Sequence, residues 1–167
     1  MNMNLATQTP LASATRLPQE LVESTTFLLK RLGFAAKDRT LAAYEETGLH
    51  PYHHAVLLVL DEGAPETQGS IADTLGYDRG QLVGLLDELE ERGLVERKRD
   101  PNDRRRHLVR LTGDGTKTLR RLRGIAGRIE DDFLSPLDDE ERAALHALLL
   151  RLAEKHEPRC ALPPQQP

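Results

Sequence analysis

Hydrophobic side chains recur at helical spacing through the first third of the chain. From residue 18 onward, one face carries Leu21, Thr25, Leu28, Leu32 and Ala36. Because these positions are three or four residues apart, they predict one long helix that Gly48 ends. Gly33 is the position at which we expect this helix to bend.

The last third of the chain repeats the helical pattern twice. A near-heptad seam over about four turns comprises Leu119, Leu122, Ala126, Ile129 and Phe133. Ser135 and Pro136 interrupt the seam, and the spacing of Asp138 and Glu141 is that of a capping box that opens another helix. The stripe of that last helix comprises Leu145, Leu148, Leu149 and Leu152. The sequence predicts no further domain against which these apolar seams could pack. We therefore expect a second copy of the chain to bury them.

The middle of the chain alternates short helical stretches with turn residues. Pro51 stands at the first position of one predicted helix, and Thr67 and Gly76 are residue types that begin and end the next. A third helix is predicted over Asp78–Arg92, with Asp78 as its N-cap. Its buried stripe comprises Leu82, Leu85, Leu86 and Leu89. Two helices joined by a short turn with a glycine form a helix-turn-helix.

A strand-like pattern follows this helix-turn-helix. Apolar and polar residues alternate over Leu94–Arg97 and again over His107–Leu111, which predicts two short strands. Pro101–Asp103 supplies the turn between them. The two strands form the wing, and the side chain of Thr112 can cap the helix that comes next.

These patterns predict a mainly helical α+β winged helix: a winged helix-turn-helix with N- and C-terminal helices forming a dimerisation bundle. The expected segments are a disordered arm (1–17), an N-terminal dimerisation helix (18–48), a winged helix-turn-helix lobe (49–112), C-terminal dimerisation helices (113–157) and a disordered tail (158–167).

The distribution of charge changes the interpretation of an acidic chain. Of the 167 residues 30% are charged, 38% are hydrophobic and none is Trp, and the net charge is −4. Residues 92–110 nevertheless hold eight basic and three acidic side chains, a local charge of +5 that leaves −9 elsewhere. An acidic protein with one dense basic segment can attract phosphate locally without binding polyanions over its whole surface. We therefore predict double-stranded DNA as a partner.

The wing also resembles a known family. Residues 103–112 match the DxRxxxxxLT signature of MarR-type transcriptional regulators, and residues 93–97 resemble the segment that leaves their recognition helix. The resemblance implies a homodimer that binds a palindromic operator, usually as a ligand-responsive repressor. It also implies that Arg105 enters the minor groove, that Asp103 holds Arg105 by an ion pair, and that Thr112 caps the following helix.

The predicted reading residues lie in the first half of the third helix. Arg79 could pair with guanine and Gln81 with adenine, because each side chain can form two hydrogen bonds with that base edge. Many relatives have Thr-Arg where this chain has Val83-Gly84, so Val83 could instead contact a thymine methyl group. The full predicted DNA-binding set is Arg79, Gly80, Gln81, Val83, Gly84, Arg97, Lys98, Arg99, Asp103, Arg104, Arg105 and Arg106.

Histidines near residue 50 leave alternatives open. His50 and His54 have an i, i+4 spacing that can bind zinc, so a metal-binding sensor built on His50, His53 and His54 is one alternative function. The resemblance to MarR-type regulators instead makes Tyr52, His53 and His54 candidates to line a pocket for a small-molecule effector. A third possibility is that the winged helix binds a protein partner instead of DNA.

Other functional classes lack support in the sequence. No phosphate-binding loop, nucleophile elbow or HExxH motif is present, so we expect neither an enzyme nor a cofactor. The single cysteine, Cys160, has only Arg159 beside it to activate it, which argues against a redox switch. No apolar run approaches the roughly 20 residues that span a bilayer, and the first 17 residues lack a signal-peptide core. We therefore expect a cytoplasmic protein that does not bind membranes.

Overall fold

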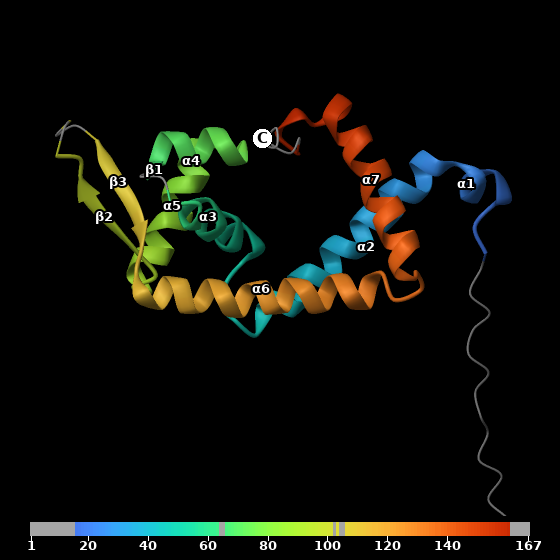
Figure 1. Ribbon diagram of the computed structural model, residues 1–167, viewed down its shortest axis with the longest axis horizontal. Coiled ribbons are helices and arrows are strands. Elements are labelled where there is room, and N and C mark those ends of the chain that lie inside the picture. Colours follow the sequence, from blue (N-terminus) through green and yellow to red (C-terminus); the bar gives the residue numbers. More distant parts are fainter. Residues whose placement is uncertain (1–15, 64–65, 102, 104–105, 161–167) are drawn as a thin grey trace, which may run out of the picture. The chain divides into compact units, whose positions relative to one another are not determined.

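The computed structural model describes residues 16–63, 66–101, 103 and 106–160. In this part the chain consists of helices and one small antiparallel sheet (Figure 1), which confirms the predicted winged-helix fold class. The chain divides into two units, which meet in sequence between Lys37 and Asp38. No helix within the described ranges is long and apolar enough to cross a lipid bilayer.

The first unit contains a break that the sequence analysis missed. Helix α1 (Gln19–Glu23) ends at Ser24, whose ψ of 112° is extended, and α2 (Thr25–Glu45) begins directly afterwards. The Ser24 hydroxyl accepts a hydrogen bond from the N–H of Phe27 at 3.4 Å, as a serine ahead of a helix commonly does. The prediction of one continuous helix from residue 18 is therefore wrong, because the helix is interrupted at Ser24. The expected bend at Gly33 stays a prediction.

Three helices of the second unit begin and end as predicted. They are α3 (Pro51–Asp61), α4 (Gln68–Leu75) and α5 (Arg79–Glu91). Thr67 caps α4 in a reciprocal capping box with Ser70, and Gly76 ends it with a φ of +66°. Asp78 caps α5 by accepting hydrogen bonds from the N–H groups of Gly80 and Gln81 at 2.8 and 3.2 Å. The helix-turn-helix is thus confirmed.

The sheet has three strands instead of the two predicted. β2 (Val95–Arg99) and β3 (His107–Leu111) form the expected hairpin, with Arg97 opposite Val109. The additional strand is β1 (Glu66–Thr67), which pairs antiparallel with the other edge of β3 and gives the order β1-β3-β2. A strand of two residues is too short to show an alternating pattern, so β1 could not be predicted from the sequence.

A single apolar core joins these elements. Its fully buried members come from α3, α4, α5, β3 and the first half of the next helix: Val56, Leu57, Ile71, Leu82, Leu86, Leu89, Val109, Leu119 and Leu122. At the edge of this core, Thr112 accepts a hydrogen bond from the N–H of Gly115 and donates one to the carbonyl of Gly93. A side chain at Gly115 would clash with the carbonyl oxygen of Leu94, so glycine permits this close approach.

The C-terminal helices begin at their predicted caps. α6 (Gly113–Phe133) follows Thr112, and α7 (Asp139–His156) follows Asp138, which forms a capping box with Glu141. The residues after α7 differ from the prediction of a disordered tail, because Pro158–Cys160 form a single 3-10 turn, η1. The predicted arm falls almost wholly, and the end of the tail (161–167) entirely, outside the described residues.

Candidate nucleic-acid interface

The first half of α5 exposes all five of its predicted reading residues. Arg79, Gly80, Gln81, Val83 and Gly84 are exposed. The leucines of the same helix are at most 8% exposed and pack into the core. This division gives α5 one buried face and one free face, which is the arrangement that a recognition helix requires.

The wing is fastened to α5 at its base. Nη2 of Arg97, on β2, contacts Oδ1 of Asp87 at 2.5 Å, and the Arg97 N–H donates to Glu90 Oε1 at 3.2 Å. The Arg97 guanidinium also lies 3.6 Å from Oε2 of Glu90, and the side chain is only 20% exposed. Arg97 was predicted to contact DNA, but the structure places it in a link between the wing and the recognition helix. Asp87 and Glu90 were not predicted from the sequence, since no local pattern pairs them with a residue on a strand.

Farther along the wing the basic side chains are free of the helix. Lys98 and Arg99 are exposed, and Lys98 forms an ion pair with Glu96 on its own strand at 2.6 Å. Asp103 forms an ion pair with Nε of Arg106 at 3.7 Å. Arg104 and Arg105 lie outside the described residues, so the proposed pair between Asp103 and Arg105 stays a prediction.

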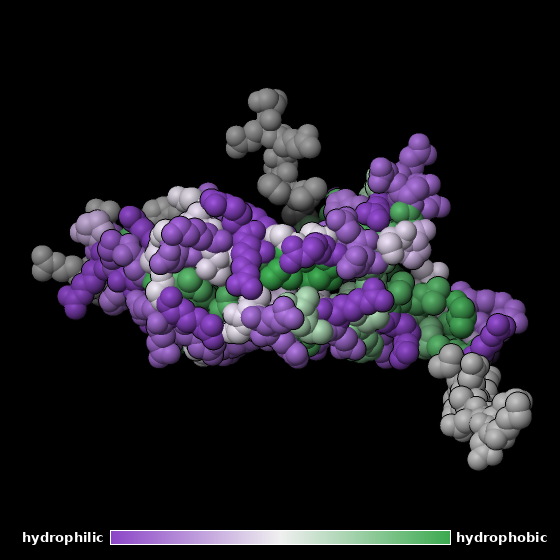
Figure 2. Space-filling model, turned by 90° about the horizontal axis from the view of Figure 1, so that it is seen from below, coloured by the Kyte–Doolittle hydropathy of each residue, from purple (hydrophilic) through white to green (hydrophobic). Residues whose placement is uncertain are grey.

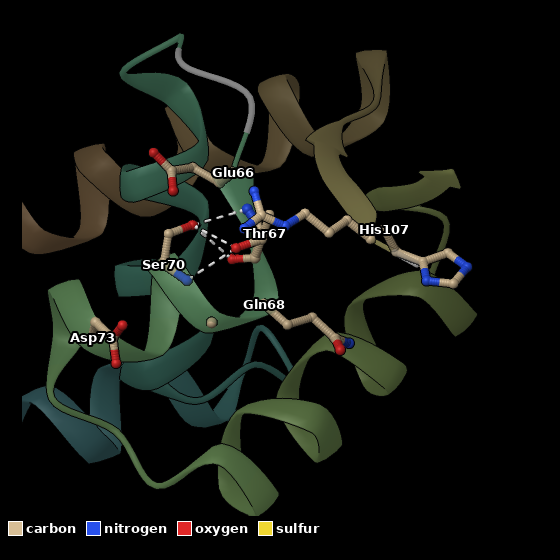
Figure 3. Close-up of a pocket in the computed structure, with 8 residues that line it drawn as sticks. Glu66, Thr67, Gln68, Ser70, Asp73 and His107 are labelled. Carbon is tan, nitrogen blue, oxygen red and sulfur yellow. Dashed lines mark hydrogen bonds between the residues drawn. The ribbon is translucent and has the colours of Figure 1, made fainter. Parts of the chain in front are cut away.

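A hollow of about 640 Å³ separates the start of α4 from the wing (Figure 3). Its lining includes two carboxylates, Glu66 and Asp73, and one guanidinium, that of Arg106. Figure 3 shows Thr67 and Ser70 hydrogen-bonded to one another and His107 pointing away from them. Because the acidic groups outnumber the guanidinium, this hollow does not extend the basic surface of the wing.

The histidine cluster serves the fold of α3. Nδ1 of His50 accepts a hydrogen bond from the N–H of Tyr52 at 3.2 Å, and Nδ1 of His53 accepts one from the N–H of His50 at 2.9 Å. These two bonds cap the start of α3. Nδ1 of His54 shares a hydrogen bond with the hydroxyl of Tyr44 at 2.5 Å. The described residues contain no group of three His, Cys, Asp or Glu side chains that could hold a metal ion.

Burial favours the neutral form of the two inner histidines. His53 is 3% and His54 is 8% exposed, and this burial lowers the pKa of both imidazoles. Glu88 on α5, whose Oε2 lies 3.1 Å from Nε2 of His53, opposes that effect for His53. Burial also raises the pKa of the Tyr44 hydroxyl. His53 thus connects α3 to the recognition helix through Glu88.

The third predicted pocket residue, Tyr52, lies on the surface. It is 42% exposed, and its ring centroid is 4.5 Å from that of His50 and 5.1 Å from that of Tyr77. Tyr77 was not singled out from the sequence. Tyr52, His53 and His54 do not line the hollow beside the wing or the two hollows along α6, so their role in effector binding stays a prediction. Cys160 is exposed.

A helix-turn-helix followed by a hairpin with exposed basic residues defines the class of winged-helix DNA-binding proteins. Comparison with known proteins agrees. Residues 47–106 match the MarR family. A protein of Thauera aromatica, named as a regulator of transcription of the hcr operon, is 32% identical over 129 residues, which cover 72% of this chain and 78% of that protein.

Solved structures give the same result. The transcriptional repressor CouR bound to a 23-mer DNA duplex is 38% identical, with a TM-score of 0.74 and coverage of 83% of this chain and 99% of that one. CouR from Rhodococcus jostii RHA1 bound to p-coumaroyl-CoA is 32% identical, with a TM-score of 0.68 and coverage of 83% and 97%. The chain therefore belongs to the MarR family of DNA-binding transcriptional regulators and is not an enzyme.

Proposed function

We propose that this chain binds a palindromic operator as a homodimer and represses transcription until a small-molecule effector releases it. The observation that carries the DNA-binding part is the link of Arg97 to Asp87 and Glu90, which holds the wing and the recognition helix as one unit. The exposed reading residues and the exposed basic residues of the wing would then meet the duplex together, in the major groove and along the adjacent backbone.

The contacts within each half-site follow from side-chain chemistry. Arg79 would bond guanine, Gln81 adenine, and Val83 would contact a thymine methyl group. Arg105 would insert into a narrow A·T-rich minor groove, where the negative potential is strongest. Lys98 and Arg99 would neutralise phosphates. Two copies of the lobe would read half-sites about 34–36 Å apart, one turn of the duplex.

The homodimer is supported by apolar surface on the outer helices. On α2, Leu28 and Leu32 are 40% and 53% exposed, and on α7, Leu148 and Leu152 are 55% and 46% exposed. Hydrophobic residues also reach the surface among hydrophilic ones on the face shown in Figure 2. Large exposed apolar side chains at helical spacing are typical of an interface, so we assign segments 18–48 and 113–157 to dimerisation.

Regulation by a ligand is proposed from the CouR structures, one bound to DNA and the other to p-coumaroyl-CoA. An effector would favour a dimer whose recognition helices no longer span both half-sites. Tyr52, His53 and His54 are the proposed effector-binding residues. Because its target would be chromosomal DNA, we place the protein in the cytoplasm.

Fluorescence anisotropy of wild type and Arg105→Ala with one operator duplex tests this function. The duplex is first selected from a random pool, and we expect a palindromic consensus. We expect Arg105→Ala to weaken binding by about 10-fold to 100-fold, since one good contact contributes roughly 1–3 kcal/mol. Arg151→Ala, a change at an exposed residue of α7, should bind like wild type.

Two outcomes would reject the proposal. Unchanged affinity of Arg105→Ala would remove the wing from the interface. Weak dependence of binding on salt would favour the alternative in which the winged helix binds a protein, because phosphate neutralisation makes affinity fall steeply as salt rises.

A further inference from the structure

A second, smaller hollow lies where three segments of the second unit meet: the turn between α2 and α3, the C-terminal end of α5, and the first half of α6. Its volume is about 200 Å³. Thr47 and Leu49 come from the turn, Arg92 and Leu94 from the end of α5, and Thr118, Arg121 and Leu122 from α6. None of these residues belongs to the predicted DNA-binding or effector-binding sets.

The charge of this hollow is of one sign. Its only charged lining residues among those described are Arg92 and Arg121. Within the described ranges no carboxylate forms an ion pair with either guanidinium, whereas other arginines of the same unit are paired, such as Arg123 with Asp61 at 2.8 Å and Arg142 with Asp131 at 3.3 Å. Two guanidinium groups that line one hollow without a carboxylate partner favour the binding of an anion there.

The Arg92 side chain is placed by the fold. Arg92 is the C-cap of α5: its N–H donates to the carbonyl of Glu88, and the N–H of Gly93 donates to the carbonyl of Glu90. Its guanidinium lies over Gly48, where a β-carbon would stand 3.3 Å from Nη1. Gly48 has a φ of +64°, which few other residues adopt. The turn after α2 and the end of α5 are therefore both shaped to hold this arginine at the hollow.

The floor of the hollow is apolar. Leu122 is fully buried, and Leu49 and Leu94 are 7% and 8% exposed. The hydroxyl of Thr47 already donates to the carbonyl of Tyr44 at 2.7 Å and accepts from the N–H of Leu49 at 3.0 Å. A ligand here would thus meet two guanidinium groups and three apolar side chains, with little demand for further hydrogen bonds.

We propose that this hollow binds a small monocarboxylate with a short hydrocarbon body. The carboxylate would lie between the Arg92 and Arg121 guanidinium groups, which can each donate two hydrogen bonds to it. The hydrocarbon would lie against Leu49, Leu94 and Leu122, so that the apolar surface of the ligand itself leaves water. Such a ligand would connect the end of the recognition helix to α6.

An adjoining hollow provides the contrast. It shares Thr47 and Arg121 with the first, but it also contains Glu46, Asp132 and Arg128. Its two carboxylates oppose the binding of a third. Arg128 lies two turns along α6 from Arg121 and lines only this adjoining hollow among the two. It is therefore the matched control for Arg121.

The test is a titration of the ¹⁵N-labelled full-length protein, without DNA, with sodium salts of propionate, butyrate, pentanoate and hexanoate. We expect chemical-shift changes at the amides of Leu49, Leu94 and Thr118. Affinity should rise about fourfold with each added methylene until the hollow is filled. Arg92→Gln and Arg121→Gln should each weaken hexanoate binding by about tenfold or more. Arg128→Gln should bind like wild type.

Three results would overturn the proposal. Equal binding of 1-hexanol would show that the guanidinium groups contribute nothing. Equal binding of sulfate, with no effect of chain length, would show that the leucine floor contributes nothing. Shift changes elsewhere in the chain, with both arginine variants unaffected, would place the ligand at another site. Since DNA is absent, failure of the Arg105→Ala operator experiment would not alter these readouts.

Discussion

The leucines of the recognition helix in the lobe are buried, whereas most of those along the apolar face of the last helix are exposed. In the lobe, Leu86 and Leu89 on α5 are fully buried. On α7, which has no buried residue, Leu148 is 55% exposed although its helix has the same apolar spacing. Periodicity therefore identifies the apolar face of a helix and leaves open what covers it. The lobe closes its core with its own chain, whereas α7 presents an uncovered face.

The largest expected effect comes from placing a charge on that uncovered face. Leu148→Glu should dissociate the proposed homodimer, because an unpaired buried carboxylate costs about 3–5 kcal/mol and the symmetric interface contains the substitution twice. Sedimentation velocity should show the wild type as a dimer and the variant as a monomer. Operator affinity should fall with dissociation, since a monomer reaches only one half-site.

Arg151→Glu is the control for this change, because it introduces the same side chain at an exposed, already charged position of α7. It should leave the sedimentation coefficient at the wild-type value. A Leu148→Glu protein that still sediments as a dimer would show that α7 does not form the interface.

A second experiment removes a leucine from the closed core. Leu86→Ala should lower the free energy of unfolding by about 2–5 kcal/mol, because it deletes fully buried methyl groups and leaves a cavity. Urea denaturation followed by circular dichroism measures this loss. Leu148→Ala should instead change stability in a manner that depends on protein concentration. Similar losses for both variants at every concentration would remove the distinction between the two regions.

The same contrast explains how much the sequence could predict. Caps and helix ends in the lobe were predicted because Thr67, Asp78 and Thr112 act within three residues of themselves, and local chemistry decides their roles. Strand β1 was missed because its pairing depends on Val109 and Leu108, more than 40 residues away. No short-range pattern records such a contact.

The wing shows this limit at the candidate site. The sequence correctly indicated exposed basic residues there, including Lys98 and Arg99. It could not separate these from Arg97, since all three stand in one basic run. The distinction arises from Asp87 and Glu90, which α5 brings to the base of the wing. The basic character of this segment could be predicted from the sequence. Which carboxylate pairs with which basic side chain could be seen only in the folded structure.

Arg97 and Arg99 therefore provide a smaller and sharper test within the wing. Arg97→Ala should lower the free energy of unfolding by about 1–2 kcal/mol, because it removes charged hydrogen bonds to Asp87 and Glu90. Arg99→Ala should leave stability unchanged and reduce the slope of log affinity against log salt by about 1. Urea unfolding and anisotropy titrations at several salt concentrations measure the two effects. If Arg97→Ala reduced the salt slope and Arg99→Ala lowered stability, then Arg97, and not Arg99, would contact the phosphates.

The smallest effect concerns the buried histidines of the lobe. Burial lowers the pKa of His53 and His54, while Glu88 counters the effect on His53, and Arg92, His50 and Arg123 add to the lowering. Below the ordinary histidine pKa of about 6.5, the unfolded chain therefore binds more protons than the folded one. The free energy of unfolding should thus be fully maintained above that pH and should decrease as pH falls through the lowered folded pKa.

Urea denaturation between pH 8 and pH 5 measures this decrease, and a variant with both His53→Gln and His54→Gln should show a flatter dependence on pH. The slope is the relevant quantity, because the glutamines also change the hydrogen bonds to His50 and Tyr44 and so shift stability at every pH. Equal slopes in the two proteins would assign the acid sensitivity to other groups. Burial of titratable side chains would then no longer distinguish the lobe from the exposed α7 in its response to pH.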